Sequence, residues 1–478
     1  MKHLCIKMLV GLMMTLSTVS ANATDNLYLV GDAVRWKWNP ESSVMMNNKG
    51  NDVFQVSVYL KANEEFKFLT VPAWGNVEYR AESLVTYLQP SVPAKLIKGQ
   101  GNPLKEEDFK FKVSKSANYD ITCDLAKGSI VLTESAYQEK EINTPNLWII
   151  GDETSAGWSI TNGIKMERNA TDPMKFSATV YLTNYVNSNK PEDSGFKFAI
   201  NSQAGWGQAF YTKNPENEGK MIFDESSDTD IKWKVTEPGT YTINVDVDAL
   251  TFSMEKKVLD IDENSESNQS VAGKYDVTLH RTFNSNAWNS LVLPFSLNAE
   301  QISKAFGSEV KVASYTGTKK NGDGTYTLLF NQLKQNEIKA NEPVIIYGVT
   351  ASSEGYTFNY VTVETGTPTK KADGFNFVGF GNKAKTVAGD WFVSSDNKLY
   401  KAKGNEEIKA TRAVFRFSDT EASSAKALAF SLGSTTGIST IIQNSKDVNC
   451  PVYNLSGQRV ARNYRGIVII NGKKIINK

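Results

Sequence analysis

Residues 26–32 read Asn-Leu-Tyr-Leu-Val-Gly-Asp, and residues 146–152 repeat this pattern as Asn-Leu-Trp-Ile-Ile-Gly-Asp. Later blocks recur in the same order, so that Val-Ser-Val-Tyr-Leu at 56–60 corresponds to Ala-Thr-Val-Tyr-Leu at 178–182. The remaining matched blocks are Phe66-Lys67-Phe68 with Phe196-Lys197-Phe198, Trp74-Gly75 with Trp206-Gly207, and residues 119–122 with residues 241–244. Several matched blocks in one order indicate a domain duplication.

Each copy consists of short runs rich in Val, Ile, Tyr, Phe and Thr that alternate with polar residues and end at Gly, Asn, Asp or Pro. This period of two is typical of half-buried antiparallel strands. Roughly seven such strands in each copy fit an immunoglobulin-like sandwich. The sequence therefore predicts an all-β chain with tandem immunoglobulin-like β-sandwiches, followed by a further β-rich domain and a small C-terminal β module.

Composition suggests the boundaries of these parts. The first residues combine a basic start, a short apolar run and the small-x-small pattern Ala21-Asn22-Ala23, as a signal peptide does. A polar, acidic stretch after the second copy has few apolar side chains to bury, and we interpret it as a linker. The predicted parts are a signal peptide (1–23), a first sandwich (24–138), a second sandwich (143–256), a polar linker (257–272), a β-rich domain of unassigned role (273–433) and a C-terminal β module (438–478).

Two local patterns lie in the second half of the chain. In residues 298–306, Ala299, Ile302 and Phe306 fall on one helical face, which predicts a helix. Near the C-terminus, Asn471-Gly472 separates two apolar-rich runs and is the preferred dipeptide of a tight hairpin.

Composition also argues against several classes of function. The net charge of +1 disfavours nucleic acid as a partner, because phosphate binding requires a basic excess. His3 lies in the predicted signal peptide, so His280 is the one histidine left, and it lies in a strand-like run. This disfavours a histidine metal site and a Ser-His-Asp triad. Cys123 and Cys450 lie in different predicted domains, so we expect no disulfide framework. Phosphate-loop and nucleophile-elbow motifs are missing from the sequence, and we expect no catalytic residue, cofactor or bound metal.

Tryptophans and a lysine recur at matched places in the two copies. They are Trp36, Trp38, Lys67 and Trp74 in the first copy and Trp158, Lys197 and Trp206 in the second. Strand alternation turns each lysine away from its flanking phenylalanines. An indole face can stack on a pyranose ring, and an ammonium donates hydrogen bonds to hydroxyls. A tryptophan in a β-sandwich is more often a core residue, but these lie in loop-like sequence and recur. We therefore predict a carbohydrate-contacting platform in each copy.

These blocks, together with Gly157-Trp158, resemble the tandem domains of the SusE/SusF family over residues 25–256. Members of that family are surface glycan-binding proteins of Bacteroidetes that capture starch and are not enzymes. The resemblance implies a polysaccharide or oligosaccharide partner, with α-glucan favoured. It implies Trp158, Lys197 and Trp206 as the binding residues of the second copy. In the first copy it implies Lys67 and Trp74, with either Trp36 or Trp38 as the earlier aromatic residue.

The C-terminal tail, residues 452–473, resembles secretion and sorting modules of the same phylum. With the predicted signal peptide, this implies an exported protein at the outer-membrane surface or outside the cell, and uptake or secretion machinery of the outer membrane as a further partner. Family members are typically lipoproteins, whereas the mature chain is predicted to begin at Thr24 rather than at a cysteine.

Two alternatives remain at the level of sequence. One is a structural or adhesive surface protein that binds a protein partner through a flat interface of about 800 Å² per partner. The other is a glycoside hydrolase, which needs two carboxylates about 5 to 9.5 Å apart, and the sequence singles out no such pair.

Overall fold

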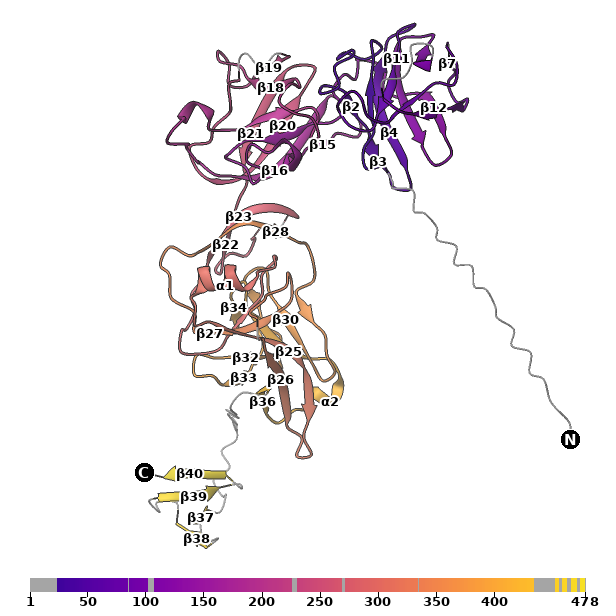
Figure 1. The fold of residues 1–478 in the computed structure, drawn as a ribbon. Helices are drawn as coiled ribbons and strands as arrows, with labels where there is room; N and C mark the ends of the chain where they lie inside the picture. Colours follow the sequence, from indigo (N-terminus) through magenta and orange to yellow (C-terminus); the bar gives the residue numbers. More distant parts are fainter. Residues whose placement is uncertain are drawn as a thin grey trace, which may run out of the picture. The chain divides into compact units, whose positions relative to one another are not determined.

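The computed structural model of the protein describes residues 24–84, 86–101, 107–225, 230–268, 271–333, 335–433, 452–454, 458–461, 466–470 and 473–477. The predicted signal peptide and Cys450 lie outside these residues. The all-β prediction is confirmed, since nearly all regular structure in the described residues is strand. The chain divides into two compact units, Met1–Lys257 and Val258–Lys478 (Figure 1).

The first copy in unit 1 is a pair of sheets, with strand orders β2-β1-β5-β6-β9 and β3-β4-β11-β12-β8. The strands of these sheets are β1 (Tyr28–Val30), β2 (Val44–Met45), β3 (Asn47–Asn48), β4 (Val53–Leu60), β5 (Lys67–Leu69), β6 (Glu78–Arg80), β8 (Ala94–Lys95), β9 (Ile97–Gly99), β11 (Ala117–Asp124) and β12 (Ser129–Glu134). A parallel pair, β7 (Thr86–Leu88) with β10 (Phe111–Val113), completes the copy. Alternate residues of β4, from Phe54 to Leu60, are buried, as the period of two requires.

The second copy repeats this arrangement with sheets β14-β13-β17-β18-β19 and β15-β16-β20-β21. Its strands are β13 (Trp148–Ile150), β14 (Ile164–Lys165), β15 (Glu167–Arg168), β16 (Lys175–Leu182), β17 (Lys197–Ala199), β18 (Phe210–Lys213), β19 (Met221–Asp224), β20 (Gly239–Asp246) and β21 (Thr251–Lys256). The register is preserved as well, because Val30 pairs with Lys67 in the first copy and Ile150 with Lys197 in the second.

The glycine that ends the first strand of each copy has a steric reason. Gly31 and Gly151 both have a φ of +146°, and a Cβ atom at either position would lie 2.1 Å from a backbone carbonyl oxygen. Only glycine allows this close approach of two backbones. The Gly-Asp pair in the repeated motif thus marks where the first strand ends and the tryptophan-bearing turn begins.

The two copies share one continuous hydrophobic core. The Trp36 ring of the first copy stacks on Phe223 of the second, with ring centroids 4.6 Å apart. Asn146 donates a hydrogen bond of 2.8 Å to the carbonyl oxygen of Met45. Packing and hydrogen bonds therefore make the tandem copies one compact unit rather than two independent modules.

The segment predicted as a polar linker, 257–272, contains a strand of unit 2. Val258–Asp262 forms β22, which pairs in parallel with β23 (Gly273–His280). Ile261 and Glu263 are each only 3% exposed. The prediction was wrong because composition revealed neither the apolar cluster that receives Ile261 nor the cations that compensate the Glu263 charge.

The rest of unit 2 contains two five-stranded sheets and several shorter elements. The first sheet has the order β24 (Asn289–Leu291), β27 (Val344–Tyr347), β25 (Lys311–Lys320), β26 (Tyr326–Gln332) and β36 (Leu428–Gly433). The second has the order β29 (Thr369–Lys370), β30 (Phe375–Gly379), β35 (Ala413–Phe417), β32 (Trp391–Val393) and β33 (Leu399–Lys401). A three-stranded sheet contains β22, β23 and β28 (Tyr356–Val363), and the shorter elements are β31 (Ala384–Lys385), β34 (Glu407–Ile408) and α2 (Thr420–Ser423).

The predicted helix is confirmed as α1 (Ala299–Phe306), with Ile302 and Phe306 buried. Asn298 and Gln301 form a capping box at its start. None of the helices in the described residues is long and apolar enough to cross a membrane.

Near the C-terminus, four strands form a sheet of order β38-β37-β39-β40. They are β37 (Val452–Asn454), β38 (Arg459–Val460), β39 (Gly466–Ile470) and β40 (Lys473–Asn477). The predicted hairpin is confirmed by the antiparallel pairing of β39 with β40, in which Ile470 lies opposite Lys473.

Candidate functional site

Two tryptophans meet in the second copy. Trp158 lies in the turn that follows β13, and Trp206 lies in the loop between β17 and β18. Their ring centroids are 6.3 Å apart, and the ring planes are inclined by 52°. Trp206 is 50% exposed, whereas Trp158 packs partly against the small apolar cluster around Ile150. The pair therefore presents an angled aromatic surface to solvent.

The first copy contains the equivalent pair, Trp38 and Trp74. Their centroids are also 6.3 Å apart, with an inclination of 38°, and Trp74 is 45% exposed. The Trp38 indole donates a hydrogen bond of 2.8 Å to Asp32, which fixes the ring against the end of the first strand. The structure thus selects Trp38 over Trp36 as the partner of Trp74.

Trp36 belongs to the contact between the copies. It is 8% exposed, and Phe223 covers one face of its ring. The Arg35 guanidinium lies 4.8 Å from the centroids of both rings. The Trp36 ring is therefore covered by protein, and the inclusion of Trp36 among the sugar-contacting residues was wrong.

The lysines of the predicted site lie beneath the exposed tryptophans. Lys67 Nζ is 5.4 Å from the Trp74 centroid, and Lys197 Nζ is 5.2 Å from the Trp206 centroid. Lys67 is only 4% exposed and Lys197 only 2%. Strand alternation correctly turned both side chains away from the phenylalanine core, but their burial does not agree with direct hydrogen bonds from the ammonium groups to sugar hydroxyls. A contact with a partly exposed aspartate holds each ammonium in the protein instead.

That contact reveals residues that the sequence reasoning missed. Asp230 accepts hydrogen bonds from Lys197 at 2.5 Å and from Lys232 at 2.9 Å. Lys232 Nζ in turn lies 5.5 Å from the Trp158 centroid. One aspartate therefore joins two lysines, and each lysine supports one indole through a cation–π contact.

The first copy has the same set of five residues. Asp108 joins Lys67 and Lys110 at 2.9 Å each, and Lys110 Nζ lies 5.7 Å from the Trp38 centroid. We call Trp38, Trp74, Lys67, Lys110 and Asp108 the first aromatic cluster, and Trp158, Trp206, Lys197, Lys232 and Asp230 the second aromatic cluster. A further repeat would have revealed the missed residues, since Asp-Phe-Lys-Phe-Lys-Val at 108–113 matches Asp-Ile-Lys-Trp-Lys-Val at 230–235.

Contacts with two lysines stabilise the ionised form of each aspartate, against the opposing effect of burial. Burial by itself raises the pKa of Asp230, but hydrogen bonds from Lys197 and Lys232 outweigh it and hold that pKa below its usual value. The pKa of Asp108 is lowered in the same way, against burial, by Lys110 and Lys67. Burial lowers the pKa of Lys197, and the Asp230 contact offsets part of that effect.

A residue next to the five-residue cluster differs between the two copies. Glu78 pairs with Leu69 in the first copy, and Phe210 takes the equivalent place opposite Ala199 in the second. The buried Glu78 carboxylate contacts the Lys67 ammonium, whereas the Phe210 ring lies 4.1 Å from Lys197 Nζ and stacks on Trp206. The second cluster is therefore the more aromatic of the two.

Residues 26–131 match the family model described as SusF/SusE starch specific CBMs. The first sandwich is SusF/SusE-like. The second sandwich is linked to it by the internal duplication. A solved structure of SusF from Bacteroides thetaiotaomicron aligns with 49% of this chain and 48% of its own, at 15% identity and a TM-score of 0.19. The alignment thus spans about half of each chain. A search of the curated proteins found no match.

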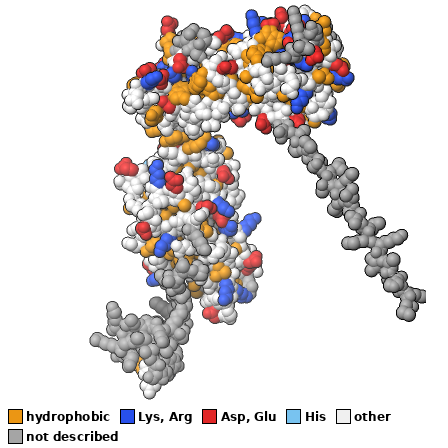
Figure 2. All heavy atoms as spheres, viewed as in Figure 1, with side chains coloured by type: hydrophobic (Ala, Val, Ile, Leu, Met, Phe, Trp, Pro, Cys, Tyr) orange, Lys and Arg blue, Asp and Glu red, His pale blue; other side chains and the backbone are white. Residues whose placement is uncertain are grey.

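The side chains around the two aromatic clusters are mixed in charge. Basic and acidic side chains are interspersed over the visible face (Figure 2). Within the described residues, no group of three or more His, Cys, Asp and Glu is arranged to hold a metal ion.

The loop that carries Trp206 is tied to the first SusF/SusE-like sandwich. Gly207 donates a backbone hydrogen bond of 2.7 Å to the Glu41 carboxylate, and Ala209 donates one of 3.2 Å to Ser42. Asn201 in the same loop reaches the carbonyl oxygens of Glu41 and Ser43 at 3.4 Å each. The position of Trp206 therefore depends on both copies.

If the second cluster contacts carbohydrate as predicted, Glu41→Ala should weaken glycan binding at that cluster alone. The lost bond is exposed, so we expect a cost of about 0.5–1 kcal/mol, or a two- to fivefold rise in Kd. Calorimetry with maltoheptaose would measure this rise in Kd in a Trp38→Ala/Trp74→Ala background, in which the first cluster is removed. Glu41→Gln retains an acceptor and should restore most of the affinity. An equal loss in a Trp158→Ala/Trp206→Ala background would refute this local role.

Glu153 should make unit 1 more stable at mildly acidic pH. It is 1% exposed, and burial raises its pKa to about 7, although Val235 donates a backbone hydrogen bond of 3.0 Å to it. Because the folded state binds the proton more tightly than the unfolded state, stability rises as pH falls from about 7 towards the unfolded value of about 4.3. Glu153→Gln should therefore raise the melting temperature at pH 8 and leave it nearly unchanged at pH 5. An equal effect at both pH values would contradict the titration of Glu153.

Proposed function

We propose that this protein is a non-catalytic, exported carbohydrate-binding protein that captures starch-like α-glucan through its two aromatic clusters. The observation that carries the proposal is the recurrence of one five-residue arrangement in both copies, with Trp74 and Trp206 half exposed. The description of the matching family as starch-specific supports the choice of ligand.

The geometry of the tryptophans favours a curved glycan. In both clusters the ring planes are inclined, by 38° and 52°. An α-1,4-linked glucan turns from one glucose to the next and offers ring faces at an angle, whereas a β-1,4-linked chain offers flat faces. Inclined indoles therefore suit stacking on successive glucoses of an α-glucan.

The lysines act as positioning residues in this proposal. Lys67 and Lys197 are buried, so their ammonium groups hold the indoles in place from beneath the rings. Glucose hydroxyls would then find partners at the rim of each cluster. Two clusters on one chain would add avidity for a polymer that can reach both.

Native affinity electrophoresis of the full mature chain tests the proposal. Gels would contain amylopectin, dextran, levan or xylan, with bovine serum albumin as the unretarded control. Retardation by amylopectin alone, without release of reducing sugar, is the expected result. Retardation by another glycan would change the ligand, and retardation in none of the gels would favour an adhesive protein with a protein partner.

Attachment and export form the second part of the proposal. The predicted signal peptide and the sorting-like C-terminal module support an outer-membrane or extracellular location, with secretion or uptake machinery as a partner. Fractionation of cells that produce the full chain would test it, and retention of the protein in the cytoplasm would contradict it.

A further inference from the structure

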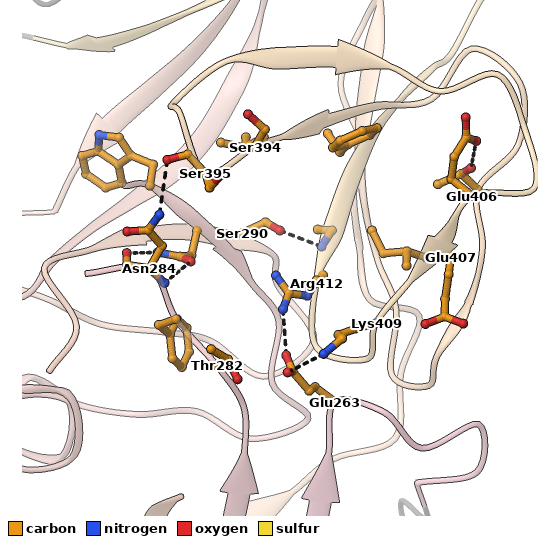
Figure 3. Close-up of a pocket in the computed structure, with 18 of the residues that line it drawn as sticks. Glu263, Thr282, Asn284, Ser290, Ser394, Ser395, Glu406, Glu407, Lys409 and Arg412 are labelled. Carbon is orange, nitrogen blue, oxygen red and sulfur yellow. Dashed lines mark hydrogen bonds and ion pairs between the residues drawn. The ribbon is translucent and has the colours of Figure 1, made fainter. Parts of the chain in front are cut away.

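Unit 2 contains a cavity of about 820 Å³ that neither of the aromatic clusters explains. It opens beside the edge strand β24 and is bordered by β32 and β34, and its lining residues are shown in Figure 3. Ligand pockets typically measure about 300–1,000 Å³, so this cavity is large enough for a small molecule of several rings.

The floor of the cavity is a fixed charge cluster. Glu263 is 3% exposed, and its two oxygens accept from Lys409 at 2.8 Å and from Arg412 at 2.7 Å. These contacts engage both carboxylate oxygens and leave further N–H donors on both cations. The side chains of Lys409 and Arg412 are 39% and 30% exposed, whereas the Arg412 Nε lies buried without a hydrogen-bond partner.

The walls supply hydroxyl groups and aromatic surface. Thr282, Ser285 and Ser395 line the cavity, and within the described part of the chain their hydroxyls form no hydrogen bond with protein. Trp288 and Phe392 also line it, and both are partly exposed.

Other contacts fix the shape of these walls. Asn284 donates a hydrogen bond of 3.3 Å to the carbonyl oxygen of Ser395 and so joins two sides of the rim (Figure 3). Trp288 lies 5.5 Å from Tyr347 between ring centroids, and Phe392 stacks on Tyr400 at 6.2 Å. Free hydroxyls, N–H donors and aromatic rings therefore face one preformed space.

We infer that this cavity is a saccharide-binding site in unit 2, separate from the two aromatic clusters, and that it takes a short neutral oligosaccharide. A purely apolar ligand would leave the wall hydroxyls and the remaining N–H donors of Lys409 and Arg412 without partners, which is costly. A phosphate-like anion is disfavoured because Glu263 already neutralises one cation. Glu406 and Glu407 add negative charge on the side opposite Asn284 (Figure 3).

The test uses the full chain with Trp38, Trp74, Trp158 and Trp206 all changed to Ala, so that only unit 2 can account for binding. Calorimetry would use maltohexaose, cellohexaose, xylohexaose and mannohexaose. We expect at least one to bind with a Kd of about 1 mM or tighter, equivalent to about −4 kcal/mol. Absence of binding with all four sugars would overturn the inference.

Cavity-filling variants then locate the binding. Thr282→Trp and Ser395→Trp each place a bulky side chain at an exposed lining position and should raise the Kd at least tenfold, while Ser308→Trp, exposed and outside the lining, should not change it. Unfolding curves would show which variants remain folded. Thr282→Arg places a different bulky side chain at the same position, for use where Thr282→Trp does not fold. Binding that persists in the folded blocking variants would also overturn the inference. Failure of amylopectin retention by the original chain would leave this result unaffected.

Discussion

The double variant Trp158→Ala/Trp206→Ala is expected to lose most of its retention by amylopectin. It removes both rings of the second aromatic cluster, which is the more aromatic one because Phe210 stacks on Trp206. Loss of stacking on two glucose rings should cost about 2–3 kcal/mol at that site, or a roughly 30- to 140-fold rise in Kd.

The expected loss is larger for a polymer than for a short oligosaccharide. With one cluster removed, amylopectin loses the gain from simultaneous binding at two sites, whereas maltotriose occupies a single site in either protein. Affinity electrophoresis measures the first effect and calorimetry the second.

Matched variants make the result specific. Tyr185 is another exposed aromatic residue of unit 1, at 53% exposure, and Tyr185→Ala should leave retention unchanged. Trp38→Ala/Trp74→Ala should give a comparable reduction through the first cluster. Unchanged retention in both double variants would show that the tryptophans do not bind the glycan.

Asp230→Ala should cause the second large effect, this time on folding. The substitution leaves Lys197 and Lys232, which are 2% and 9% exposed, without the carboxylate that joins them. Breaking a fully buried pair costs about 3–5 kcal/mol, and because the Asp230 side chain is 43% exposed we expect about 1–3 kcal/mol here. Thermal unfolding at pH 7 would measure the loss.

The pH dependence identifies the cause. Since the pKa of Asp230 is lowered in the folded state, its stabilisation is present above the unfolded value of about 3.9 and is lost as pH falls below it. The difference in melting temperature between the original chain and Asp230→Ala should therefore shrink below pH 4. Asp193→Ala removes the longer contact to Lys232 at 3.5 Å and an exposed contact to Lys190 at 3.7 Å, and it should cost much less. Equal losses in both variants would argue against a special role for Asp230.

Sequence alone determined the duplication, the all-β class, the helix α1 and the pairing of tryptophans from two loops. These features depend on local information. A period of two or of 3.6 shows which face of an element is apolar, and a repeated block shows which residues must occupy equivalent places. For this reason Trp158 with Trp206, and Trp74 in the first copy, could be predicted from the order of residues along the chain.

Only the tertiary structure decided between Trp36 and Trp38, because Phe223 of the other copy covers the first of them. Only the structure showed that Lys67 and Lys197 are buried and that Asp108 and Asp230 hold them. Alternation gives the direction of a side chain, whereas burial depends on what packs over it from elsewhere in the chain. The burial of Ile261 and Glu263 could not be predicted for the same physical reason, since their apolar and charged partners lie far away in sequence.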